Sequence, residues 1–368
     1  MLAEKNHRVT IFVIFELLCT LCLAQSQTTN DLYINANRHY GYLLPEYQFV
    51  NYLENDNIHS IDLRLSKQTT GEDIWQQLYK YPSYGISLFV STLGNNEVFG
   101  KQIALYPFCS INIIGNRIFN LYYQIGPGIC YVTKKYDKST DYENIAIGSN
   151  LNIFFNFEIG TKLRLYKKIY FTGGLAFHHY SNANLQEPNL GLNYLTIFGG
   201  LSYLLGKQSE RTVTEIPPFH RSNDFFIVYA AGGRHSRALT GYGYFTSSVS
   251  LEMKRKLFYK FHLGIGSDLF YDTSTKSEME SKGEGTEYKK QYDFTSGLHL
   301  SEEFVFNRLS LIIQEGIYLL LTDKVNHYVM YNRGTIRYKF SNHLMGSLSM
   351  KSHLQILDYP ELGIGYCW

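Results

Sequence analysis

Most of the chain alternates between apolar and polar residues with a period of two, which is the repeat of a β-strand with one apolar face. The clearest example is the segment 151–165. Its odd-numbered positions are almost all apolar, whereas its even-numbered positions include Asn152, Glu158 and Lys162. A strand of this length exceeds the roughly five or six residues that are usual in soluble sheets. The pattern, apolar outside and charged inside, predicts a transmembrane β-barrel.

The alternation divides the chain into about sixteen candidate strands, which we expect to pair with their neighbours in antiparallel fashion. The connections after odd-numbered strands include long ones at 45–56, 133–146, 182–192 and 273–288. Most connections after even-numbered strands are short. Long loops at one end and tight turns at the other are typical of outer-membrane barrels. We therefore expect a single all-β, antiparallel barrel of about 14–16 strands. The candidate strands cover residues 32–42, 57–66, 83–92, 99–113, 117–132, 147–165, 168–181, 193–205, 224–234, 242–253, 257–272, 289–304, 309–321, 328–340, 343–355 and 361–368.

The N-terminus has the features of a secretory signal. Lys5 and Arg8 precede an apolar run at 9–24, so we expect residues 1–24 to be a signal peptide cleaved near Ala24. A single membrane anchor is the alternative interpretation. The 34 Lys and Arg nearly balance the 32 Asp and Glu, which argues against nucleic acid as a partner. A mean hydropathy of −0.20 is too polar for a helical membrane protein.

A histidine and a serine stand two residues apart at the end of the strand predicted at 168–181. His179 and Ser181 therefore share one face of the strand, and that face is otherwise apolar. Asn193 has the same parity at the start of the next strand. A histidine base beside a serine hydroxyl is the minimum for an activated serine nucleophile. Polar groups of this kind on a lipid-facing surface indicate an enzyme that acts on lipid.

The two halves of the predicted sheet resemble each other. Segment 110–113 leads to 123–128 in the first half, as 248–251 leads to 261–266 in the second half. The second half has no His-x-Ser motif at the corresponding place. We interpret it as a possible non-catalytic repeat, the alternative being that generic barrel strands look alike.

The stretch 177–194 resembles the lipid A 3-O-deacylase family, whose members are also known as acyloxyacyl hydrolases. The matching residues are His179-x-Ser181-Asn182-Ala183, followed by Pro188-Asn189-x-Gly191. The resemblance implies an eight-stranded outer-membrane barrel that removes the 3-linked acyl chain of lipid A without a metal or an organic cofactor. It implies that Ser181 is the nucleophile and His179 the base. It further implies that Asn182 and nearby backbone N–H groups hold the oxyanion, and that Asn189 shapes the loop.

One position departs from that family, which has a glutamate where this chain has Asn193. Outer-membrane phospholipase A, which needs calcium and dimerises, also has His-x-Ser-Asn followed by a similarly spaced asparagine. An amide oxygen can accept a hydrogen bond from the far N–H of His179, although it stabilises the imidazolium less than a carboxylate does. Glu187 is the alternative acid. The longer match, through Pro188 and Gly191, favours a serine esterase of lipid A; a phospholipase A-like acyl hydrolase and a non-enzymatic barrel, either a pore or a structural protein, are the alternatives.

The resemblance also gives an alternative architecture. The half with the active site spans 25–206, a linker spans 207–223, and the C-terminal half spans 224–368. In the alternative, the first half is an eight-stranded enzymatic barrel and the second half is a separate barrel. The last predicted strand ends on Trp368 and resembles the C-terminal signal that is read by the barrel-assembly machinery. Expected partners are therefore that machinery, lipid A or lipopolysaccharide as substrate, and the outer-membrane bilayer of a Gram-negative bacterium.

Overall fold

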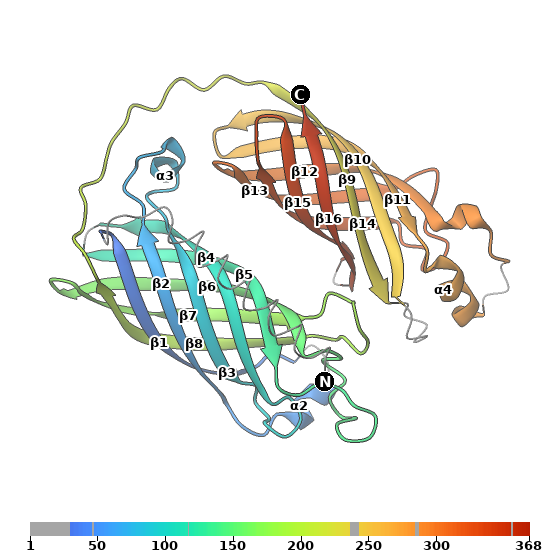
Figure 1. Cartoon of the computed structure of the whole chain (residues 1–368), viewed down its shortest axis with the longest axis horizontal. Helices are drawn as coiled ribbons and strands as arrows, with labels where there is room; N and C mark the ends of the chain where they lie inside the picture. The colour runs from blue at the N-terminus through green and yellow to red at the C-terminus, as the bar shows by residue number, and fades with distance from the viewer. Residues whose placement is uncertain (1–29, 46–47, 117, 236–242, 284–286, 355) are drawn as a thin grey trace, which may run out of the picture.

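A computed structural model of the protein describes residues 30–45, 48–116, 118–235, 243–283, 287–354 and 356–368 (Figure 1). The predicted signal peptide lies outside the described residues. Within them, sixteen strands form two closed antiparallel barrels. The first barrel contains β1 (Leu32–Leu43), β2 (Ile58–Gln68), β3 (Ser83–Thr92), β4 (Lys101–Gly115), β5 (Phe119–Val132), β6 (Leu151–Tyr166), β7 (Ile169–Ser181) and β8 (Leu192–Leu204). The second contains β9 (Asn223–His235), β10 (Gly243–Phe258), β11 (Phe261–Asp272), β12 (Phe294–Phe306), β13 (Leu309–Tyr318), β14 (Met330–Lys339), β15 (Leu344–His353) and β16 (Ile356–Cys367).

The predicted fold class, an all-β antiparallel barrel, is confirmed, and the structure has the two-barrel form of it. The expectation of one barrel of 14–16 strands was wrong, because β8 pairs with β1 rather than with β9. The register of this closing pair places Leu204 opposite Tyr33 and Tyr194 opposite Leu43. Closure at this point satisfies the backbone groups of both edges. The following segment, 205–222, contains Pro217-Pro218, which lack the N–H groups that a ladder requires, and it connects the two barrels as an arch (Figure 1).

The walls of both barrels follow the predicted alternation. In β6, Asn152, Asn156 and Glu158 are buried inside, whereas Leu151 and Ile159 are exposed outside. An apolar belt that faces outward all round is what a barrel needs in order to lie in a bilayer. Among the described residues, no helix has both the length and the apolar character needed to span a membrane.

Paired charges fill the interiors. In the first barrel, the Arg64 guanidinium donates to both carboxylate oxygens of Glu158 at 2.8 and 2.6 Å, and its Nε lies 2.7 Å from Asp62 Oδ2. In the second barrel, Arg333 donates to Asp268 at 3.1 Å. Buried charges are tolerated only when they are paired in this way. These contacts tie strands on opposite sides of each barrel together.

The two ends of the barrels differ. We call the end that carries the connections after odd-numbered strands the loop end, and the other the turn end. The loop end holds most of the long connections, with α2 (Gln48–Leu53), α4 (Thr275–Lys282) and the 3-10 helix η1 (Lys290–Asp293). At the turn end, the connection between β2 and β3 contains the short helix α3 (Ile74–Leu78). The sequence did not predict α2 or α4, because α2, with six residues, is too short to show a helical period and α4 is too polar to show an apolar one.

The barrels touch each other at both ends. At the turn end, the Tyr79 hydroxyl donates to the Val305 carbonyl at 3.0 Å, and its ring stacks on Phe306 with centroids 4.4 Å apart. At the loop end, the Asn184 side chain of the first barrel donates to the Asp358 carbonyl of the second at 3.0 Å. The connection between β7 and β8 is therefore in contact with the second barrel.

Candidate active site

The candidate site lies at the loop end of the first barrel, where β7 ends and β8 begins. The register of these strands places His179 directly opposite Asn193. Cross-strand partners point to the same face of a sheet, and here that face is the outer one. Further along the same face, Leu175 is 55% exposed and Ile197 is 60% exposed. The site is therefore part of the outer wall, at the rim of the apolar belt.

Three side chains form a continuous hydrogen-bonded series. His179 Nδ1 lies 2.6 Å from Asn193 Oδ1, and His179 Nε2 lies 3.2 Å from Ser181 Oγ. An amide oxygen can only accept, so the Nδ1–H donates to Asn193 and the Nε2 lone pair is directed at the serine hydroxyl. All three residues are partly exposed. An imidazole held in this tautomer can take the proton of an attacking hydroxyl.

The loop after Ser181 is folded by two asparagines. Asn182 Oδ1 accepts from the backbone N–H groups of Leu185 and Gln186 at 3.2 and 3.4 Å, and Asn182 Nδ2 donates to the Gln186 carbonyl at 2.6 Å. The N–H of Asn182 in turn donates to Asn189 Oδ1 at 2.9 Å. The Asn189 side chain therefore bonds to the first residue of the loop, and the Asn182 side-chain amide is itself bonded within the loop.

The connection between β5 and β6 packs beside this loop. Asn189 forms a β-bridge with Ile147, and the Gly191 N–H donates to the Ala146 carbonyl at 3.0 Å. Near its tip, the Asp137 carboxylate accepts hydrogen bonds from Ser139, which lower the pKa of that carboxyl well below its usual range. The support that this connection lends to the site could not be predicted from sequence, because the contact joins loops that are distant in the chain.

Gly191 has a steric reason to be glycine. Its φ is +72°, and a Cβ at this position would lie 3.1 Å from His179 Cε1. A side chain there would be strained and would also press on the imidazole ring. In the sequence, Gly191 was only one residue of a motif; the structure shows that it borders the candidate base.

Two further residues near the site, His178 and Glu187, are not part of the hydrogen-bonded series. His178 points into the barrel, where its Nε2 lies 3.1 Å from Thr196 Oγ1 and its ring stacks on Tyr194 with centroids 4.6 Å apart. It is fully buried and serves packing. Among the described residues, no hydrogen bond or ion pair joins Glu187 to His179. The described part of the chain also shows no group of three or more His, Cys, Asp or Glu side chains placed to hold a metal ion.

Comparisons with known proteins match a family model to each barrel. The family model for lipid A 3-O-deacylase (PagL) matches residues 59–202, which include the candidate site. The family model for the C-terminal domain of acyloxyacyl hydrolase matches residues 223–368, which make up the second barrel. No curated protein matches the chain. Among solved structures, mutants of the Rhodopseudomonas blastica porin match at 9% identity over 92% of this chain and 100% of theirs, with a TM-score of 0.18, which carries no argument about the fold.

The two family models describe the two barrels separately, and together they account for nearly all of both. The first covers strands β2 to β8, and the second covers β9 to β16. Both models name the same chemistry, the hydrolysis of an acyl ester. The chain therefore belongs to the lipid A 3-O-deacylase family of acyl ester hydrolases.

Proposed function

We propose that the first barrel is a serine esterase that removes an ester-linked acyl chain, at a 3-position, from lipid A in the outer leaflet of a Gram-negative outer membrane. The observation that carries the proposal is the hydrogen-bonded series of Asn193, His179 and Ser181 on the outer wall. A pore would place its working polar groups inside the barrel. Here the hydroxyl faces the side from which a lipid arrives.

In the proposed reaction, Ser181 Oγ attacks the acyl carbonyl carbon and His179 Nε2 takes the hydroxyl proton. Asn193 Oδ1 accepts a hydrogen bond from the Nδ1–H of the imidazolium, which keeps the ring in place. When the tetrahedral intermediate collapses, His179 gives its proton to the departing sugar oxygen and an acyl-enzyme is left on Ser181. His179 then takes a proton from water, which attacks the acyl carbonyl carbon. When this second intermediate collapses, His179 returns the proton to Ser181 Oγ, and the fatty acid and the free enzyme are released.

Asn182 and Asn189 are the supporting residues of this proposal. As the structure has it, the Asn182 amide is bonded to Leu185 and Gln186. We infer that these asparagines hold the loop whose backbone N–H groups stabilise the oxyanion. One well-placed donor of this kind is typically worth about 3–4 kcal/mol of transition-state stabilisation. The reaction needs no metal or organic cofactor.

Asn193 is the observation that favours a second candidate, a phospholipase A-like acyl hydrolase. That class also has an asparagine in this place and depends on calcium. The two candidates share the nucleophile and the base, and they differ in the lipid and in the need for the ion.

The proposal extends to the rest of the chain. We propose that residues 1–24 are a signal peptide and that the second barrel, reached through the linker, is non-catalytic. We also propose that the barrel-assembly machinery recognises β16. Beside that strand, Trp368 is 59% exposed and stacks on Phe225 and Tyr366, with ring centroids 6.2 Å apart in both cases.

Mass spectrometry of lipid A tests the proposed reaction. Lipid A would be extracted from cells that express the wild type, Ser181→Ala or the control Ser222→Ala, which changes an exposed serine in the linker. We expect the loss of one hydroxyacyl mass with the wild type and with Ser222→Ala, and intact lipid A with Ser181→Ala. Intact lipid A in every strain, together with calcium-dependent release of fatty acid from phospholipid, would overturn the proposal in favour of the phospholipase.

A further inference from the structure

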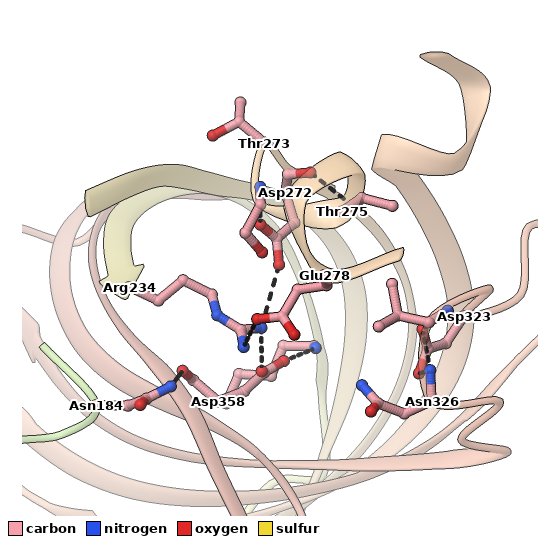
Figure 2. A network of polar contacts seen from close by, with 12 residues as sticks. Asn184, Arg234, Asp272, Thr273, Thr275, Glu278, Asp323, Asn326 and Asp358 are labelled. Atoms are coloured by element: carbon pink, nitrogen blue, oxygen red, sulfur yellow. Dashed lines mark hydrogen bonds and ion pairs between the residues drawn. The ribbon is translucent and has the colours of Figure 1, made fainter. Parts of the chain in front are cut away.

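The loop that follows Ser181 reaches into the mouth of the second barrel. Asn184, at the tip of a loop, is only 5% exposed, because it lies against that barrel. Its Nδ2 donates to the Asp358 carbonyl at 3.0 Å, and its own carbonyl accepts the His235 N–H at 3.1 Å. Figure 2 shows Asn184 entering beside Asp358 and Arg234. The loop is thus held from its far side by the ends of β9 and β16.

We call the part of the second barrel that contacts Asn184, around Asp358 and His235, the receiving edge. Buried charges hold it in place (Figure 2). Arg234 Nη1 lies 2.6 Å from Asp358 Oδ1, and Lys351 Nζ lies 2.8 Å from Asp358 Oδ2. Arg234 also lies 3.3 Å from Asp272 and 3.4 Å from Glu278. These groups come from β9, β11, α4, β15 and β16. Paired buried charges with several partners fix the geometry of the groups that they join, so Asp358 offers its carbonyl in a defined place.

We call the contact between Asn184 and the Asp358 carbonyl the anchor. The loop itself connects this anchor to the catalytic residues. Asn184 follows Ser181 by three positions, and both Ala183 and Asn184 have left-handed backbones, with φ of +55° and +60°. The same turn contains the Asn182 bonds to Leu185 and Gln186. A shift at Asn184 therefore moves the segment that we propose carries the oxyanion donors. Displacements of about 1 Å at such donors can lower turnover by roughly 100-fold.

We infer that the second barrel is a positioning module for the active site of the first, and that Asn184 is the positioning residue through which it acts. This inference rests on the proposed esterase function of Ser181. Among the residues that the structure describes, the second barrel contributes no group to the hydrogen-bonded series of Asn193, His179 and Ser181. Its contribution is to hold the loop after the nucleophile, from outside the barrel that carries the chemistry.

Two substitutions at Asn184 test the inference in the full-length protein. Asn184→Gly keeps the left-handed backbone and removes the amide donor. Asn184→Asp keeps size and turn preference but presents an acceptor to the Asp358 carbonyl. The control is Lys276→Ala, which changes an exposed residue of α4 at the same mouth. A further variant, Arg234→Gln, loosens the receiving edge without touching the loop.

The first readout is hydrogen exchange of the loop residues 182–191, which does not depend on activity. The second is kcat and KM for lipid A, with Ser181→Ala as the blank. We expect faster exchange and a fall in kcat of roughly 10- to 100-fold for both Asn184 variants, with KM little changed and Lys276→Ala like the wild type. Arg234→Gln should show the same pattern in milder form.

The outcomes separate the two proposals. Unchanged exchange in Asn184→Gly overturns the anchor, and faster exchange with unchanged kcat overturns the positioning role. If the wild type shows no more hydrolysis than Ser181→Ala, the proposed esterase function fails, whereas exchange still decides whether the second barrel holds the loop. Should Arg234→Gln fail to fold, the two Asn184 variants decide alone.

Discussion

At the scale of single residues, Asn193 is the position that separates the two candidate functions, because the resemblance to lipid A deacylases implies a glutamate there. The 2.6 Å contact between Asn193 Oδ1 and His179 Nδ1 places an amide oxygen where it can orient the imidazole ring. An amide orients the ring but offers less stabilisation to the imidazolium that forms during the reaction. Orientation and charge can therefore be tested separately at one position.

Asn193→Ala should lower kcat roughly 10- to 100-fold with little change in KM, because it frees the ring of the base and leaves the outer wall intact. This is less than the roughly 10⁴-fold effect of disturbing a charged triad. Asn193→Glu should retain or raise kcat, since it adds the missing charge. Steady-state kinetics on lipid A in detergent would measure both. Unchanged kcat in Asn193→Ala would mean that Glu187 or water orients His179.

Gly191→Ala should disturb the same ring from the other side. The new Cβ would lie 3.1 Å from His179 Cε1 on a backbone with φ of +72°. We expect a stability loss of about 1–2 kcal/mol from the backbone and a fall in kcat of roughly tenfold or more from the displaced base. Thermal unfolding and kinetics would measure the two effects. Gly334→Ala, where a Cβ meets nothing within 4 Å, is the control and should leave both unchanged.

Period-two parity predicted that His179 and Ser181 share the outer face, and the structure agrees. The same parity predicted that Asn193 faces outward as well. Its pairing opposite His179 depends in addition on the strand register, which the loop between them sets. The bonds of the Asn182 amide within the loop could not be predicted, because they depend on backbone turns that no simple spacing rule describes. Asn182 remains a supporting residue in the proposal, acting through the loop.

At the scale of strands, the alternation predicted most of the elements to within a few residues. The segment expected at 151–165 is β6, Leu151–Tyr166. Alternation reports which side chains face outward, but it does not report which strands pair. Alternation therefore could not predict that β8 closes on β1, and it favoured one large barrel, with two small ones as the alternative.

The interior of the first barrel makes a prediction at this scale. Arg64→Ala would leave Asp62 and Glu158 buried without their guanidinium partner. Removing one member of such a buried group typically costs about 3–5 kcal/mol. Denaturant unfolding, followed by the heat-dependent shift in gel mobility, should show a lower midpoint for Arg64→Ala. Arg164→Ala, which changes an exposed arginine near the turn end of β6 in the same barrel, should unfold like the wild type; equal midpoints for both variants would contradict the expected stabilising role.

At the scale of the whole molecule, two eight-stranded barrels meet through few contacts at opposite ends. The sequence suggested a second copy without the His-x-Ser motif but gave no role for it. The bond from Asn184 to Asp358 joins positions 174 apart in the chain, and its donor is an ordinary loop asparagine. Only the arrangement of the barrels in space brings the two together, so the inferred positioning role had no sequence signal.

The outward direction of Ser181 has a consequence for how the enzyme meets its substrate. A lipid that is already in the membrane reaches the outer wall by lateral diffusion, in two dimensions. The frequency of encounters is then set by the mole fraction of substrate in the leaflet rather than by its concentration in the surrounding water. Inert lipid added to the same membrane dilutes the substrate and slows turnover, although the total amount of substrate is unchanged. The released fatty acid enters the same membrane leaflet, where it competes for the place that the next substrate must occupy.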